Sequence, residues 1–114
     1  MEPTILPNEM IFIKEQKNYK ENDIITYRDK FGMLITHRII EIDGQNIITK
    51  GDSNNSVDED VSIDKVEGKV IFHSIILGYV FLYILRPLII IMLFGYLISF
   101  LKYILIGKIF LKLC

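Results

Sequence analysis

The chain has 114 residues, a formal net charge of −1 and one cysteine, so it is long enough for one small domain and holds no disulfide framework. All 14 acidic residues lie up to Glu67, where they outnumber nine basic residues ending at Lys69, so this first part carries −5 and the remainder +4. Because the first part has no basic patch, the composition gives no support for nucleic-acid binding.

The N-terminal part of the chain predicts extended structure. Pro3 and Pro7 exclude a helix interior over the first seven residues. Glu9–Lys14 is a predicted strand, and Asp23–Arg28 is a second one because of its β-branched and aromatic content. The charged residues between these two strands indicate a solvated loop.

A predicted hairpin from Met33 to Lys50 follows, with Asp43-Gly44 suited to its tight turn. With a two-residue turn there, His37 lies opposite Lys50. His37 and Asp52 then share one face, a diagonal step of about 7–8 Å apart. An imidazole beside a carboxylate is the base and orienting group of a nucleophilic triad. A surface hairpin with an ordinary His and Asp fits the same pattern, so both interpretations stay open at this point.

The acid-rich stretch from Gly51 to Asp60 predicts a loop rather than a calcium-binding EF-hand. An EF-hand that started at Asp52 would need Gly at its sixth position and Glu at its twelfth, where the sequence has Val57 and Ile63. A last strand is predicted from Val66 to Phe72 by its apolar content.

The C-terminal part predicts a membrane anchor, since His73 and Arg86 are the sole acidic, basic or histidine residues between Val70 and Leu101. About 20 apolar residues span a bilayer. We therefore expect a β domain over residues 1–72, an interfacial connector over 73–86, a transmembrane helix over 87–106 and a cytosolic tail over 107–114. The later lysines place the C-terminus in the cytosol and the β domain outside. The alternative is two short spans that turn at Arg86-Pro87.

The predicted fold class is therefore mainly β, a small β domain followed by a C-terminal transmembrane helix. Five segments in this order resemble signal peptidase I. Met1-Glu2-Pro3-Thr4 is similar to the family segment Ser-Met-x-Pro-Thr, which begins with the nucleophile. The other four segments are Asn22–Arg28, in which Asn22 stands where the family has Gly, Thr36–Ile40, Thr49–Asn54 and Gly68–Phe72.

The resemblance is to the endoplasmic-reticulum and archaeal subtype, also found in some Gram-positive bacteria, in which Ser, His and Asp serve. It implies that His37 is the general base and that Asp52 orients it or stabilises its charged form. Asp58 is the predicted second acidic residue, with Asp60 as the alternative. Met1, Pro3 and Thr4 would contact substrate. No metal or organic cofactor is implied.

The implied function is that of a serine endopeptidase in the plasma membrane of a prokaryote, which removes signal peptides from exported preproteins. The family nucleophile immediately precedes the position of Met1 and is therefore missing from this sequence. Either the start is placed too late, or this is an inactive fragment. The alternative function is a catalytically inactive, membrane-anchored β module that binds peptides or a partner.

Overall fold

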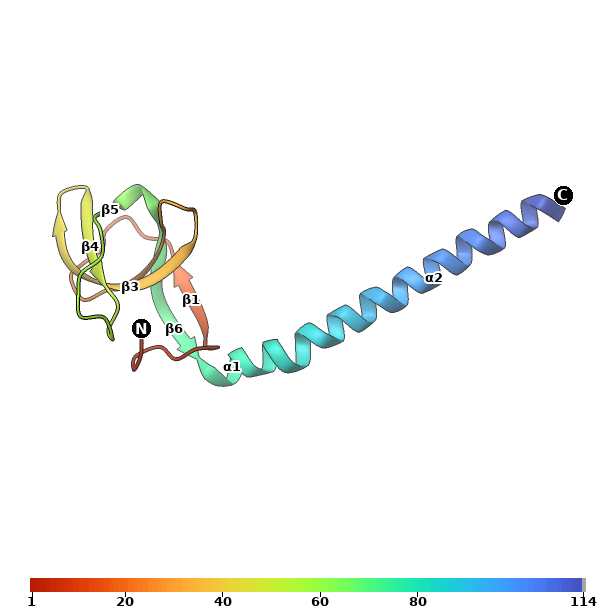
Figure 1. Ribbon diagram of the computed structural model, residues 1–114, viewed down its shortest axis with the longest axis horizontal. Helices are drawn as coiled ribbons and strands as arrows, with labels where there is room; N and C mark the ends of the chain where they lie inside the picture. Colours follow the sequence, from red (N-terminus) through yellow and green to blue (C-terminus); the bar gives the residue numbers. More distant parts are fainter. Residues whose placement is uncertain (114) are drawn as a thin grey trace. The chain divides into compact units, whose positions relative to one another are not determined.

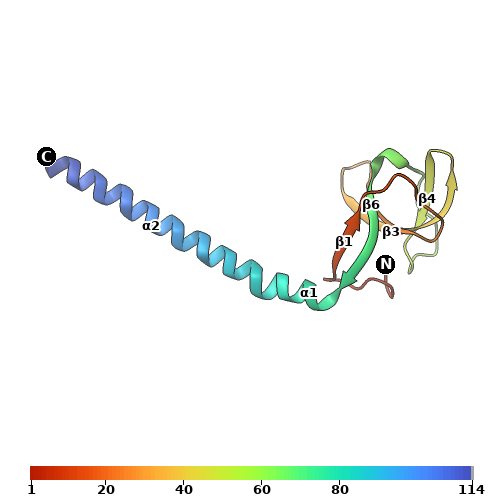
Figure 2. The same cartoon turned by 180° about the vertical axis from the view of Figure 1, so that it is seen from behind.

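The computed structural model describes residues 1–113 in two units, Met1–Gly78 and the chain from Tyr79 onward. The first unit, called the β unit below, is a six-stranded antiparallel sheet in the order β1-β6-β2-β3-β4-β5 (Figure 1). The strands are β1 Met10–Lys14, β2 Ile24–Arg28, β3 Leu34–Asp43, β4 Asn46–Lys50, β5 Val61–Ser62 and β6 Val66–Ser74, with a 3₁₀ turn at Ile63–Lys65 between β5 and β6. The sheet curls, as the view from behind also shows (Figure 2).

The predicted class, mainly β with a C-terminal helix, is confirmed. One continuous helix runs from Ile75 to Leu113 and is long and apolar enough to cross a membrane. It consists of α1 Ile75–Val80, a π-helical turn Phe81–Leu85 and α2 Arg86–Leu113. Cys114 lies outside the described residues.

The helix differs from the prediction around Pro87. The predicted connector over 73–86 is helical from Ile75 onward, and the chain does not turn at Arg86-Pro87. Pro87 has no N–H for the carbonyl of Tyr83, and inside a regular helix its ring would clash there. The wider π-helical turn Phe81–Leu85 ends two residues before Pro87, which is the kind of local adjustment that lets a helix continue through a proline.

The hairpin of β3 and β4 forms as predicted but in a different register. Its two turn residues are Gly44 and Gln45, so Asp43 pairs with Asn46 rather than forming part of the turn. Gly44 takes a positive φ of 59°, which glycine adopts without strain. A β-bulge between Ile39 and Glu41 shifts the pairing once more, and Arg38, not His37, lies opposite Lys50.

The core of the β unit lies on one face of the curled sheet. Its buried apolar residues come from the central strands β2, β3 and β4 and from β5: Ile25, Tyr27, Ile39, Ile47 and Val61. β5 was not predicted because a two-residue strand carries no periodicity. It nevertheless adds Val61 to the core and closes the loop that begins at Gly51.

Gly78 allows the N-terminal segment, residues 1–9, to lie against the start of the helix. It is the buried residue of α1, and a Cβ at this position would overlap the carbonyl oxygen of Asn8 and approach the backbone nitrogen of Met10 to 3.0 Å. Backbone atoms cannot move aside as side-chain ends can. The absence of a side chain at Gly78 is therefore required for this contact.

We expect Gly78→Ala to destabilise the β unit by about 1–3 kcal/mol, because an extra methyl group must displace backbone. Denaturant unfolding of the full chain in detergent micelles, followed by tyrosine fluorescence, measures the effect. Gly95→Ala is the matched control, since a Cβ at Gly95 in α2 meets nothing within 4 Å. Equal unfolding free energies for the two variants would contradict this packing.

Candidate functional site

An imidazole–carboxylate pair lies where the loop after β4 returns to the sheet. His37 Nδ1 is 2.5 Å from Asp58 Oδ2, and both side chains are largely buried. His37 is held in the middle of the sheet because β3 pairs there with Ile25 of β2. The backbone N–H of Asp58 donates to the carbonyl of Thr49 at 2.8 Å, which fixes the loop against β4.

The pair sets the tautomer of the imidazole. An ionised carboxylate only accepts hydrogen bonds, so neutral His37 must carry its proton on Nδ1 and leave the lone pair of Nε2 free. A Cβ at Gly51 would come within 3.0 Å of this Nε2 and 2.9 Å of Asn54 Nδ2. Gly51 thus leaves space for the imidazole. The arrangement can accept a proton from a hydroxyl group at Nε2.

Two buried hydroxyl groups lie beside Asp58. Thr49 Oγ1 is 2.9 Å from Asp58 Oδ2 and 3.1 Å from the hydroxyl of Tyr27. Thr49 and Tyr27 are almost completely buried. Burial raises the pKa of Tyr27, and the negative charge of Asp58 raises it further, so the phenol stays protonated at neutral pH.

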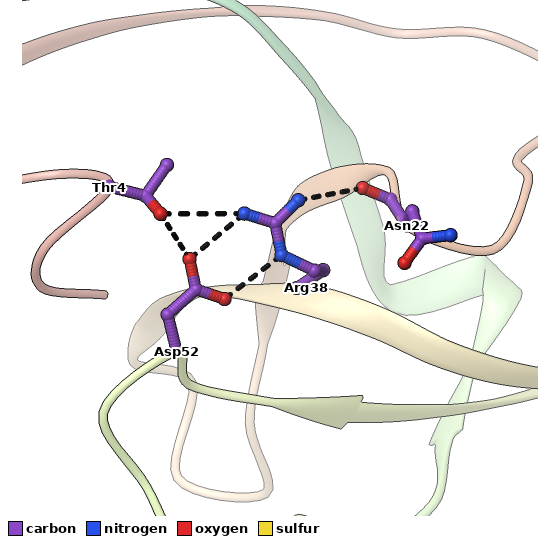
Figure 3. Close-up of polar contacts among 4 residues, drawn as sticks. All are labelled: Thr4, Asn22, Arg38 and Asp52. Atoms are coloured by element: carbon purple, nitrogen blue, oxygen red, sulfur yellow. Dashed lines mark hydrogen bonds and ion pairs between the residues drawn. The ribbon is translucent and has the colours of Figure 1, made fainter.

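Asp52 belongs to a second cluster, with Arg38 and Thr4 (Figure 3). The guanidinium of Arg38 grips the carboxylate with two hydrogen bonds, Nε to Oδ1 and Nη2 to Oδ2, each 2.9 Å. The Thr4 hydroxyl donates to Asp52 Oδ2, and Arg38 Nη1 donates to the carbonyl of Asn22 at 3.0 Å. The hydrogen bonds from Arg38 lower the pKa of Asp52 to about 2.

Asn22 stands where the signal peptidase I segment that it resembles has Gly. It takes a positive φ of 70°, a conformation that glycine adopts freely and that asparagine tolerates best among other residues. Asn can therefore stand where the family has Gly. Its backbone N–H donates to the carbonyl of Ile39, and its own carbonyl receives the Arg38 hydrogen bond.

The structure thus brings His37 and Asp58 together but separates Asp52 from them. The predicted placement of Asp52 on the same face as His37 is wrong, because Arg38 and not His37 lies opposite Lys50 and Asp52 pairs with Arg38. Successive residues of a strand point to opposite faces of the sheet, so His37 and Arg38 pair with different carboxylates. Asp60, the alternative second acid, lines a pocket of about 370 Å³ beside Asp58.

The three residues predicted to contact substrate lie in the N-terminal segment, with different surroundings. Met1 lines a pocket of about 450 Å³ together with Thr36 and Ser53. Thr4 is bonded to Asp52, and Pro3 follows a cis peptide bond. Met1 alone of the three therefore lines this pocket.

Sequence reasoning gave no role to Tyr27, Arg38 or Thr49. The period-two pattern of β3 could have predicted that Arg38 and His37 point to opposite faces of the sheet. Nothing local could have identified Tyr27 and Thr49, because their hydroxyl groups meet across separate strands. Among residues 1–113, no group of three or more His, Cys, Asp or Glu side chains is arranged to hold a metal ion.

Comparisons with known proteins give no relative. No family model, no curated protein and no solved structure matches the chain.

The depressed pKa of Asp52 predicts a loss of stability in acid. The folded pKa of about 2 lies below 3.8, the ordinary pKa of an aspartic acid side chain. The ion pair therefore contributes fully above about pH 4, and its contribution of about 2 kcal/mol is lost as the pH falls towards 2. The unfolding free energy measured across this range tests the expectation.

Asp52→Asn should flatten the pH dependence between pH 4 and 2. Glu67→Gln is the control, because its pair with Arg28 is exposed and worth little. An unchanged acid profile in Asp52→Asn would show that the pair does not stabilise the fold.

Proposed function

We propose that this chain is a membrane-bound serine endopeptidase of the signal peptidase I type, which removes signal peptides from exported preproteins. The observation that carries the proposal is the contact between His37 Nδ1 and Asp58 Oδ2 at 2.5 Å. It joins two of the residues to which the family resemblance assigns catalytic roles. The ordered motifs from Met1 to Phe72 supply the reaction class.

In this proposal the nucleophile is a serine that directly precedes Met1. Its hydroxyl gives its proton to Nε2 of His37 as its oxygen attacks the scissile carbonyl. The imidazolium, stabilised by Asp58, then returns that proton to the leaving amine when the peptide bond breaks. Water attacks the remaining ester in the same way and releases the signal peptide with a free carboxylate.

The position of the N-terminal segment supports a nucleophile at this point. A Cβ on Gly51 would come within 3.0 Å of His37 Nε2, and Asp52 directly follows Gly51. The Arg38–Asp52–Thr4 cluster ties this segment to the β3–β4 hairpin (Figure 3). Asp52 therefore serves to position the segment that carries the nucleophile.

The proposal also includes a location in the membrane and an orientation across it. Its length and apolar character allow one span. Lys102 lies near the end of the predicted span, and Lys108 and Lys112 follow it. We therefore place the C-terminus in the cytosol and the β unit on the extracytoplasmic side, where preproteins emerge. The expected partners are the lipid bilayer and signal-peptide-bearing preproteins.

The test uses a chain extended upstream to include the in-frame residues before Met1, reconstituted in lipid vesicles with a preprotein. His37→Ala should abolish cleavage, and Asp58→Asn should lower turnover by about 10⁴-fold. His73→Ala is the matched control, because His73 also pairs with a carboxylate, that of Glu9 at 2.7 Å, outside the site. Full activity in His37→Ala, or a stop codon in place of the upstream serine, would rule out the proposal.

One observation favours a second candidate, a non-catalytic β module that binds peptides. Within residues 1–113, the hydrogen-bond partner of the His37 ring is Asp58, and no serine hydroxyl is bonded to it. Ser53 lies in the pocket lined by Met1 instead. Cleavage of a preprotein by the purified 114-residue chain would eliminate this candidate, whereas binding without cleavage in the upstream-extended chain would favour it.

A further inference from the structure

Three neighbouring strands contribute side chains to one series of hydrogen bonds that ends at His37. Tyr27 lies on β2, His37 on β3 and Thr49 on β4, and these strands are adjacent in the sheet. The rings of Tyr27 and His37 meet edge to face with centroids 6.5 Å apart. Asp58 completes the chain from the loop after β4. The order of contacts is Tyr27 hydroxyl, Thr49 Oγ1, Asp58 Oδ2, His37 Nδ1.

Two contacts from Thr49 hold Asp58. The carbonyl of Thr49 accepts from the Asp58 N–H at 2.8 Å, and its Oγ1 lies 2.9 Å from the carboxylate oxygen that faces His37. Without the second contact, the carboxylate could rotate about its side-chain bonds while the backbone stayed in place. Thr49 therefore fixes the direction of the carboxylate as well as the position of the loop.

Tyr27 completes the hydrogen bonding of Thr49. A buried hydroxyl without a partner costs free energy, and Thr49 is fully buried. With Tyr27 and Asp58 on either side, its oxygen takes part in two hydrogen bonds. Thr49 has one hydroxyl proton and Asp58 can only accept, so Thr49 donates to Asp58 and Tyr27 donates to Thr49, and these two hydrogen bonds strengthen each other.

We infer that Thr49 and Tyr27 are positioning residues, which hold Asp58 Oδ2 against His37 Nδ1 and so keep the proton of neutral His37 on Nδ1, with Nε2 free to act as a base. Their consequence for catalysis rests on the proposed function. Their effect on the imidazole does not, since it can be measured on the chain without any substrate.

The experiment follows the His37 ring nitrogens by NMR in the full ¹⁵N-labelled chain in detergent micelles at neutral pH. In Thr49→Val, we expect the Nδ1-protonated population to fall and the Nδ1 proton to exchange with water about tenfold faster, as loss of a hydrogen bond to a charged group predicts. Tyr27→Phe should accelerate this exchange about threefold, because it weakens the chain one step further away. Thr49→Ser keeps the hydroxyl and should restore the wild-type signals.

The matched control is Thr26→Val. Thr26 is a buried threonine of β2 whose hydroxyl bonds with Thr36 at 2.8 Å, away from Asp58. An unchanged His37 spectrum in Thr49→Val, or an equal change in Thr26→Val, would overturn the inference. If the amide NMR signals of the sheet show that Thr49→Val does not fold, the His37 signals of Tyr27→Phe test the inference instead, because that variant keeps the buried ring.

Turnover of the upstream-extended chain separates this inference from the proposed function. Thr49→Val should lower kcat about tenfold and leave KM unchanged, since Thr49 acts on the base and not on substrate. If the His37 signals respond but the wild-type extended chain cleaves nothing, the proposed function fails and the positioning role stands. If the extended chain is active and the His37 signals do not respond, the positioning role fails alone.

Discussion

The alternation of side chains along β3 is the constraint on which the site depends. His37 and Arg38 are neighbours in sequence, yet a strand turns them to opposite faces of the sheet. Each then takes its own carboxylate, Asp58 for His37 and Asp52 for Arg38. One strand thereby organises two functions at once, a proton-accepting imidazole on one face and an anchor for the N-terminal segment on the other.

The two carboxylates differ in role because their partners differ in chemistry. Asp52 meets a permanent cation that binds it through two parallel hydrogen bonds, a geometry that fixes structure and keeps the carboxylate charged. Asp58 meets an imidazole, a group that can accept a proton at one ring nitrogen while it donates from the other. The Arg38 pair is suited to holding the chain in place, whereas the His37 pair is suited to proton transfer. The structure thus separates anchoring from proposed chemistry.

The strands that form the apolar core of the β unit also carry the hydroxyl groups that contact Asp58. Ile25, Ile39 and Ile47 form an apolar core, while Tyr27 and Thr49 on the same strands bring hydroxyl groups to Asp58. Among the described residues, no buried side-chain nitrogen or oxygen lacks a hydrogen-bond partner. A satisfied polar network of this kind favours one arrangement of the imidazole over others. Packing of the core and orientation of the proposed base are therefore linked.

The sequence by itself determined the strands other than β5, the presence of the hairpin and the long apolar helix, because periodicity, turn residues and apolar length are local properties. It did not determine the bulge beside Ile40, the course of the helix through Pro87 or which acid meets His37. A one-residue change of register reverses the face of every following side chain. The choice between Asp52 and Asp58 was therefore made by the tertiary structure, through the bulge and the loop that returns Asp58 to Thr49.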